Sequence, residues 1–314
     1  MSPLKNYNKS VTLRMLAEYY MQQNGIMSRF LTKKLYRIYC FGKSIVFFPQ
    51  KYNLLIMPYL ELCITPRCSL KCINCANLMQ YYDKPKDYDT ARIIATVDRL
   101  LECVDSIDCF RILGGEPFLH KDIARIIGYC AEQGKLVRIQ VVTNGTIVPS
   151  DEVLSALEHA KASVYISDYG VVSGNRLRLE KCLSLRGIAH FSDSNYVWDD
   201  MGGLARRDYT PERVRSVYQG CKDICKTMVD GVVYVCPRSA HADKLGIVTM
   251  KEQDSVTVFT GSVKEVRCRL RNLYDVDYIE ACYHCNAVEC RSKIVAGEQC
   301  KTIPPLIRGR LNGT

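Results

Sequence analysis

Three cysteines lie close together in the first third of the chain. Cys68, Cys72 and Cys75 form a C-x3-C-x2-C run after a short apolar segment. Cysteine thiolate is the usual ligand of a four-iron cluster, so three closely spaced cysteines can hold three irons and leave the fourth open to a small molecule. Structural zinc normally needs four ligands, and no fourth Cys or His lies nearby in the sequence. The spacing therefore predicts an iron–sulfur cluster with one open corner.

Short apolar strands alternate with amphipathic helices through the middle of the chain. We predict strands over 59–65, 109–113, 136–142, 162–167 and 187–191. Between them we predict a helix capped by Asp89 and helices over 121–133, 151–159 and 177–185. This alternation implies right-handed crossovers and a parallel sheet, here an open or partial (β/α) barrel.

Polar or glycine-rich segments follow the second, third and fourth predicted strands. They are Gly114-Gly115-Glu116-Pro117, Thr143-Asn144-Gly145 and the pair Ser167 and Asp168. In parallel α/β folds and (β/α) barrels, sites are built at the edge where the strands end. We therefore expect these segments to meet the cysteine loop at one edge of the sheet.

At these residues the chain resembles the radical SAM (S-adenosylmethionine) superfamily over about residues 58–217. The cysteine run, the GGEP segment and the TNG segment match the family's motifs in order. The resemblance implies a partial (β/α)6 TIM-like barrel whose cysteine loop binds a 4Fe-4S cluster. It also implies that SAM is bound by Gly114, Gly115, Glu116, Pro117, Thr143, Asn144, Ser167 and Asp168, with the Glu116 carboxylate suited to the amino group of SAM.

The implied chemistry needs one electron from an external donor such as flavodoxin or ferredoxin. Reductive cleavage of SAM gives methionine and a 5′-deoxyadenosyl radical, which takes a hydrogen atom from the substrate. Cys63, on the first predicted strand, is a candidate for returning a hydrogen atom, although free cysteine is more often a small buried apolar residue. The segment Tyr196–Asp200 either contacts substrate or closes a folded loop.

A second group of cysteines follows residue 217 and resembles the SPASM extension of radical SAM enzymes. Asp230-Gly231 predicts a hairpin within it. The resemblance implies a small α+β domain with one or two auxiliary 4Fe-4S clusters, and we favour two. Ile294 stands where the pattern usually has a further cysteine, so Cys268 could substitute or one iron could be open. A single-cluster "twitch" version would use Cys221 or Cys225 with Cys236, Cys282 and Cys285, and a zinc ribbon is a further alternative. The full candidate ligand set is Cys221, Cys225, Cys236, Cys282, Cys285, Cys290 and Cys300.

Composition sets the cellular context that we expect. The chain has 314 residues, 17 cysteines and a net charge of +10, and residues 1–55 carry nine basic residues against one acidic residue. We find no signal peptide and no apolar stretch long enough to span a membrane, so we expect a cytoplasmic protein. In a reducing cytosol, clustered cysteines more often bind metal than form disulfides. We expect three parts: a basic, mostly helical segment over 1–57, the barrel over 58–217 and the auxiliary cluster domain over 218–314.

The substrate is predicted only by class. Residues 1–57 lack the strand signals of a leader-binding domain, so we favour oxidation or epimerisation of a sugar-like or nucleotide-linked small molecule. Excess positive charge suits a phosphorylated or nucleotide-linked sugar, and it suits an acidic leader peptide too. The alternative is a maturase that modifies a ribosomally made peptide, and a remote alternative is a zinc-stabilised binding protein. No nucleic-acid motif is found, so we expect no nucleic-acid partner.

Overall fold

The computed structural model describes residues 54–194, 196–221, 225–286 and 292–301, and an eight-stranded sheet forms its centre. The order across the sheet is β11-β10-β9-β2-β4-β5-β6-β7, and the six strands from β9 to β7 are parallel. The parallel strands are β2 (Leu60–Cys63), β4 (Phe110–Leu113), β5 (Ile139–Thr143), β6 (Ser163–Asp168), β7 (His190–Ser194) and β9 (Lys226–Val229). The two outer strands, β10 (Val232–Tyr234) and β11 (Ser255–Thr257), are antiparallel. This sheet confirms the α/β class.

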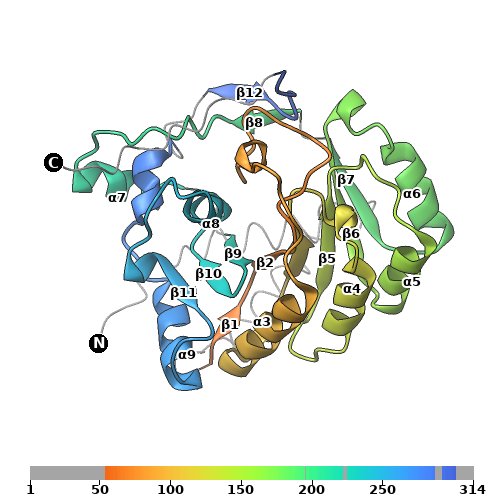
Figure 1. The fold of residues 1–314 in the computed structure, drawn as a ribbon, viewed down its shortest axis with the longest axis horizontal. Coiled ribbons are helices and arrows are strands. Elements are labelled where there is room, and N and C mark those ends of the chain that lie inside the picture. The colour runs from red at the N-terminus through yellow and green to blue at the C-terminus, as the bar shows by residue number, and fades with distance from the viewer. Residues whose placement is uncertain (1–53, 195, 222–224, 287–291, 302–314) are drawn as a thin grey trace, which may run out of the picture.

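Four helices connect the parallel strands from β2 to β7 and lie along one side of the sheet (Figure 1). They are α3 (Thr90–Cys103), α4 (Ile123–Ala131), α5 (Asp151–His159) and α6 (Arg176–Leu185). Asp89 caps α3 as expected, because its carboxylate accepts the Arg92 N–H. Most boundaries differ from the sequence prediction by up to three residues: β5 begins at Ile139, α4 spans Ile123–Ala131, and the strand expected over 187–191 runs from His190 to Ser194.

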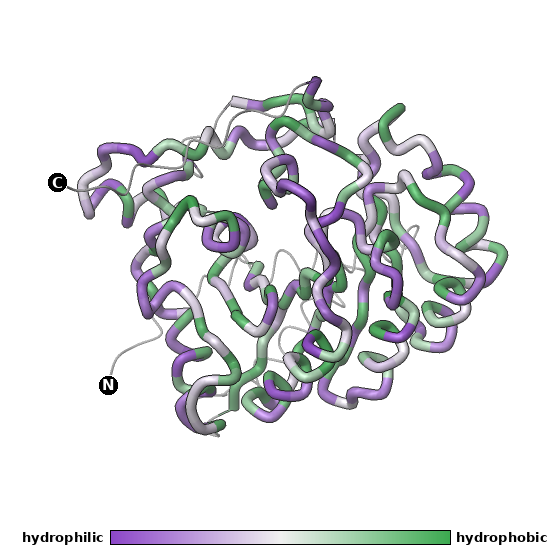
Figure 2. The backbone as a smooth tube through the Cα atoms, in the orientation of Figure 1, coloured by the Kyte–Doolittle hydropathy of each residue, from purple (hydrophilic) through white to green (hydrophobic). Residues whose placement is uncertain are grey.

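Alternation along the strands gives the sheet two different faces. Leu62, Ile112, Val141 and Val164 belong to the main apolar core, which includes the inner faces of the helices. Their neighbours Glu61, Arg111, Gln140 and Ser163 are aligned across β2, β4, β5 and β6 and point to the opposite face. Figure 2 shows the hydrophobic colour concentrated along these strands and helices. The inner face of the barrel is thus polar at this level.

The C-terminal part of the chain extends the same sheet. β9 pairs with β2 in parallel, and the expected hairpin to β10 turns at Asp230 and Gly231, whose φ angles are 48° and 81°. Such positive φ values are those of a type I′ turn. The sheet therefore crosses the boundary that we expected near residue 217, and the division into three parts stays a prediction. Residues 1–53 of the basic segment lie outside the described residues.

The remaining elements are short and surround the sheet. Two small pairs form apart from it, β1 with β3 in parallel and β8 with β12 antiparallel. No helix in the described ranges is long and apolar enough to cross a membrane. The bounds are β1 (Ile56–Met57), β3 (Ser106–Ile107), β8 (Val197–Asp199), β12 (Lys293–Val295), α7 (Pro211–Gln219), α8 (Pro237–Lys244), α9 (Val263–Asn272), and the 3-10 turns Met79–Tyr81, Pro117–Leu119, Gly170–Val172, Glu252–Asp254 and Glu280–His284.

Candidate active site

A cavity of about 610 Å³ lies at the ends of the parallel strands. The thiols of Cys68, Cys72 and Cys75 line it, because all three come from the loop that follows β2. Across the cavity lie residues from three of the predicted strand ends: Gly114 and Gly115, Thr143 and Asn144, and Ser167. The structure therefore brings together most of the residues that the sequence placed at this edge.

Hydrogen-bond donors surround the three thiols. The Leu70 N–H lies 3.4 Å from the Cys68 sulfur, and the Asn144 side-chain amide lies 3.6 Å from it. Burial nevertheless raises the pKa of the Cys68 thiol to about 12 and that of the Cys72 thiol to about 11. Metal ligation requires thiolates, so binding of a cationic metal centre must release these protons.

The donor set fits a cluster better than a single ion. In the described part of the chain, no three His, Cys, Asp or Glu side chains converge in the way that one metal ion requires. Tetrahedral zinc gathers all its ligands on a single ion, whereas the thiolates of a four-iron cluster bind separate irons and stand further apart. The three cysteines share one loop and line one cavity, and Cys75 and Cys72 lie close enough to raise the pKa of Cys68, which suits a cluster that binds each thiolate on its own iron.

The two glycines of the GGEP segment are required by the cysteine loop itself. A Cβ on Gly114 would lie 2.3 Å from the Thr65 carbonyl oxygen, and a Cβ on Gly115 would lie 2.4 Å from the Arg67 carbonyl oxygen. Two backbone hydrogen bonds join the segments, from the Gly115 N–H to Thr65 and from the Glu116 N–H to Arg67, both at 2.8 Å. Glycine therefore allows the loop after β4 to pack directly on the loop that carries the thiols.

Glu116 does not line the cavity, and the contact expected between its carboxylate and SAM stays a prediction. The side chain is fully buried and accepts hydrogen bonds from the Thr143 hydroxyl and the Asn144 N–H, each at 2.9 Å, and from the Phe118 N–H at 3.2 Å. Burial raises the pKa of Glu116 to about 7, while these donors act in the opposite direction. Its carboxylate ties the end of β4 to the end of β5, and Pro117 follows it at the start of a 3-10 turn.

Asn144 links the end of β5 to the cysteine loop. Its amide nitrogen donates to the Ser69 hydroxyl at 3.1 Å, and its amide oxygen accepts the Thr146 N–H at 3.0 Å. Gly145 then turns the chain with φ +72°. This residue is held from both sides, which fixes its amide beside the Cys68 sulfur.

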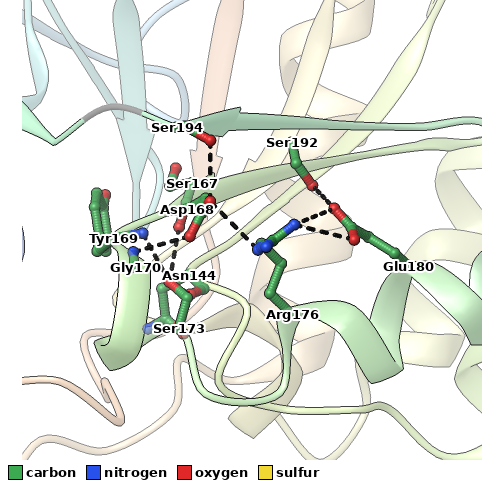
Figure 3. A network of polar contacts seen from close by, with 10 residues as sticks. All are labelled: Asn144, Ser167, Asp168, Tyr169, Gly170, Ser173, Arg176, Glu180, Ser192 and Ser194. Atoms are coloured by element: carbon green, nitrogen blue, oxygen red, sulfur yellow. Dashed lines mark hydrogen bonds and ion pairs between the residues drawn. The ribbon is translucent and has the colours of Figure 1, made fainter.

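Asp168 is the second expected cofactor residue that points elsewhere. Its carboxylate accepts the Gly170 N–H at 2.9 Å and the Ser194 hydroxyl at 3.0 Å, and it pairs with Arg176 at 3.3 Å (Figure 3). The residue is 2 % exposed and does not line the cavity. Its role is to hold the loop after β6, and Ser167 before it and Tyr169 after it reach the cavity instead.

A two-stranded ribbon forms a further wall of the cavity, and the sequence did not identify it. β8 pairs with β12, which lies almost a hundred residues later. Trp198 on β8 meets the ring of Tyr169 edge to face, with centroids 5.3 Å apart. Asp199 pairs with Lys293 at 2.5 Å, and both line the cavity. The sequence pointed to this wall only through the segment Tyr196–Asp200, which contains Trp198. The partner strand β12 has no local sequence pattern that predicts a strand.

Comparison with known proteins agrees with this geometry. Residues 62–168 match the model of the radical SAM superfamily. These residues form a radical SAM domain. Members of this family use a 4Fe-4S cluster and SAM.

The matches to curated relatives are short. GTP 3′,8-cyclase of Clostridium acetobutylicum is 32% identical over 91 residues, which are 29% of this chain and 28% of that protein. The S-adenosylmethionine-dependent nucleotide dehydratase of Selenomonas ruminantium is 29% identical over 85 residues, 27% of this chain and 29% of that protein. The alignments thus span less than a third of these relatives. Among solved structures, BtrN in complex with AdoMet and 2-DOIA has a TM-score of 0.45 at 15% identity, covering 79% of this chain and 97% of that one.

Beyond the radical SAM domain, four cysteines of the C-terminal part influence one another. Burial raises the pKa of the Cys282 thiol, and neighbouring Cys236, Cys221 and Cys285 raise it further. Cys236 caps α8, and Cys282 and Cys285 lie in and after the 3-10 turn at Glu280–His284. The single-cluster alternative expects Cys221 or Cys225 together with Cys236, Cys282 and Cys285, and Cys221 is the one of the first two that influences Cys282.

The other candidate cysteines lie elsewhere. Cys225 lines the cavity. Cys300 lies at the first cysteine loop, because its backbone N–H donates to the Lys71 carbonyl. Cys268 is exposed on α9. An exposed thiol gives no support to Cys268 as a substitute ligand, and Cys290 lies outside the described residues. Cys63 is buried below the cysteine loop, with its thiol 3.6 Å from the Thr65 carbonyl oxygen, and does not line the cavity. That position does not favour hydrogen-atom return by Cys63.

Proposed function

We propose that this chain is a radical SAM enzyme that oxidises or epimerises a sugar-like or nucleotide-linked small molecule. The observation that carries this proposal is one cavity shared by three cysteine thiols and the glycine-rich and polar ends of the parallel strands. A bound four-iron cluster and SAM supply reductive cleavage of a carbon–sulfur bond and, from it, abstraction of hydrogen from a substrate.

The chain's own residues would bind and orient these groups. Cys68, Cys72 and Cys75 would hold the cluster. Gly114, Gly115 and the side of Asn144 that lines the cavity would contact SAM. Glu116 and Asp168 would act behind them, by holding the strand ends that carry these contacts.

Polar groups inside the barrel favour a polar substrate. Glu61 lines the cavity and accepts the Thr227 hydroxyl at 3.0 Å. Next to it, the Arg111 guanidinium lies 4.9 Å from the ring centres of both Tyr59 and Tyr165. Among the described residues, the buried Arg111 Nε has no hydrogen-bond partner. Arg111 does not itself line the cavity, so Glu61 is the charged group of this pair that a ligand would meet.

The relatives support the nucleotide-linked class over a peptide. Both the GTP 3′,8-cyclase and the nucleotide dehydratase act on nucleotides by their names. The asymmetric cavity, with thiols at one side and Glu61, Asp199 and Lys293 elsewhere on its wall, suits a ligand with several hydroxyl or phosphate groups.

The cluster assignment is tested by anaerobic reconstitution with iron and sulfide. The parent should give a cubane EPR signal after reduction and should release 5′-deoxyadenosine from SAM with dithionite. Cys68→Ala should lose about four irons and reduce this release at least a hundredfold. Cys182→Ala, a cysteine on α6 remote from the cavity, is the matched control. SAM cleavage at the parent rate in Cys68→Ala would refute the assignment.

The substrate class is tested by turnover. Nucleotide-linked and free sugars, offered with SAM and reductant, should include one that consumes SAM in proportion to product. If only a ribosomal precursor peptide is modified, the peptide-maturase alternative replaces the proposal. Glu61→Gln should raise the KM of the accepted sugar without changing the iron content.

We also propose a single auxiliary cluster on Cys221, Cys236, Cys282 and Cys285, in place of the two clusters favoured from the sequence. The position of Cys221, Cys236 and Cys285 around Cys282, close enough to raise its pKa, supports this cluster. The reconstituted chain should then hold about eight irons, the number for two four-iron clusters. Cys282→Ala should reduce this to about four, and Cys225→Ala should leave it unchanged. About twelve irons in the parent would favour two auxiliary clusters.

A further inference from the structure

The segment Lys293–Cys300, which we call the strap, crosses the cysteine loop of the radical SAM domain. The Ile73 N–H donates to the Glu298 carbonyl at 2.8 Å, and the Cys300 N–H donates to the Lys71 carbonyl at 2.7 Å. Cys72 and Gln299 form an antiparallel bridge between the two segments. Cys72 is only 7 % exposed, so its environment is set in part by a segment more than 200 residues away in sequence.

The side chain of Gln299 is oriented by its own contacts. Its amide oxygen accepts the Lys71 N–H at 2.7 Å. A backbone N–H can only donate, so this contact fixes which end of the amide is oxygen. The amide nitrogen therefore points the other way, where it lies 2.6 Å from the Gly297 carbonyl oxygen and 3.3 Å from the Cys72 sulfur.

The strap itself is held at both ends, which keeps this amide in place. At one end β12 pairs with β8, and at the other end the backbone bonds to Lys71 and Ile73 anchor it. Between them Gly297 has φ +71°, and a Cβ there would lie 2.7 Å from the Tyr169 Cβ. The strap thus passes so close to Tyr169 that only glycine fits at residue 297. Because the strap is anchored on both sides of Gln299, the Gln299 amide is held beside the Cys72 sulfur.

We propose that Gln299 is a positioning residue that raises the reduction potential of the cluster bound by Cys68, Cys72 and Cys75. Hydrogen bonds to the sulfur ligands of an iron–sulfur cluster stabilise its more negative, reduced form and so raise its potential. Gln299 donates such a bond to Cys72, and it does so from a segment of the chain outside the radical SAM domain. This inference rests on the cluster assigned under the proposed function.

The test is the midpoint potential of the reconstituted, full-length protein, measured by EPR during a redox titration. The relevant signal is the part of the spectrum that changes when SAM is added, because only an iron with an open position can bind it. Gln299→Met keeps the side-chain length and removes the donor. We expect its equilibrium constant for reduction to fall about tenfold, or about 59 mV for a one-electron couple.

Two further variants separate the hydrogen bond from the anchoring of the strap. Gln299→Glu keeps an oxygen that can accept the Lys71 N–H but sets a carboxylate oxygen against the sulfur, so its potential should fall further than that of Gln299→Met. Val295→Ala shortens an exposed side chain of the strap and should leave the potential unchanged. A Gln299→Met protein with full iron content and the parent potential would overturn the inference.

The outcomes distinguish this inference from the proposed function. If the parent itself holds no SAM-responsive cluster, the proposed function fails. If the parent and Gln299→Met both hold the cluster at the same potential, the cluster assignment stands and only the role of Gln299 is lost.

Discussion

Gly115 shows how one missing side chain sets the position of the cysteine loop. A Cβ at this residue would lie 2.4 Å from the Arg67 carbonyl oxygen and 2.7 Å from the Cys68 Cβ. Gly115→Ala should therefore displace Cys68 and cost roughly 1–3 kcal/mol of unfolding free energy, the usual range for overpacking. The amount of iron that the variant binds on reconstitution should also fall, because Cys68 is displaced.

Gly128 provides the matched control for that substitution. It lies inside α4, and a Cβ there would meet nothing within 4 Å. Gly128→Ala should stabilise the protein by roughly 0.5–1 kcal/mol, because alanine has the higher helix propensity, and should leave iron binding unchanged. Urea unfolding measures the free energy of unfolding of both variants. An equal change in Gly115→Ala and Gly128→Ala would mean that the close approach at Gly115 has no energetic consequence.

Glu116 illustrates a buried carboxylate that joins neighbouring loops. Glu116→Leu would leave the Thr143 hydroxyl and the Asn144 and Phe118 N–H groups without their acceptor. We expect a loss of about 3 kcal/mol in the unfolding free energy of the apoprotein, since buried unsatisfied donors are costly. Glu116→Gln, which keeps one acceptor oxygen, should lose clearly less. A Leu variant as stable as the parent would contradict the network.

At the scale of elements, α9 joins the C-terminal part to the barrel by packing on α3. Leu270 on α9 is fully buried in the main apolar core. Leu270→Ala should cost about 3 kcal/mol, the middle of the range for removing a buried leucine side chain. Cys268→Ser, two residues away on the exposed side, should change the free energy of unfolding by less than about 0.5 kcal/mol. An unchanged iron content in Cys268→Ser would also agree with its exposed position.

The elements differ in how far the sequence could predict them. The strands from β2 to β6 and the helices between them follow from local hydrophobic periodicity, and Asp230-Gly231 marks its hairpin locally. Periodicity does not state which strands pair, so the placement of β9 beside β2 was not predictable. β8 and β12 have three residues each, too few for a pattern, and depend on each other to form.

The candidate site shows the same division. Spacing alone predicted that Cys68, Cys72 and Cys75 act together, because those thiols share one loop. The resemblance to the radical SAM superfamily assigned Glu116 and Asp168 to SAM. In the structure both carboxylates contact neighbouring loops, and these contacts depend on how the loops pack. The spacing of residues in the sequence does not predict that packing.

The pH dependence of the whole molecule should carry the signature of one buried histidine. Burial, helped by the nearby Lys244 ammonium, lowers the pKa of His241 to about 3. In the unfolded chain a histidine titrates near its ordinary value of about 6.5. Below that pH the unfolded chain binds a proton at this histidine that the folded chain does not bind. The contribution of His241 to the unfolding free energy is therefore fully present above about pH 6.5 and is lost as the pH falls toward 3.

Between pH 7 and pH 5.5 this group should remove about 1.2 kcal/mol from the unfolding free energy of the apoprotein. In His241→Gln, whose amide can still meet the Tyr82 hydroxyl that contacts the ring at 2.8 Å, that loss should disappear. Urea titrations of both proteins at the two pH values give the comparison. If the unfolding free energy changes with pH by the same amount in the parent and in His241→Gln, then His241 is not held neutral in the folded state.

The central position of β2 also has a consequence for synthesis. Glu61 on β2 and Thr227 on β9 are joined across 166 residues of chain. A ribosome that adds about 5–20 residues per second needs roughly 10–30 s to make that length. During this time the nascent β2 has β4 on one side and a bare edge on the other, and bare strand edges invite pairing with other chains. Polypeptides that end before β9 should therefore aggregate, and chaperones that shield the growing sheet should raise the yield of full-length protein.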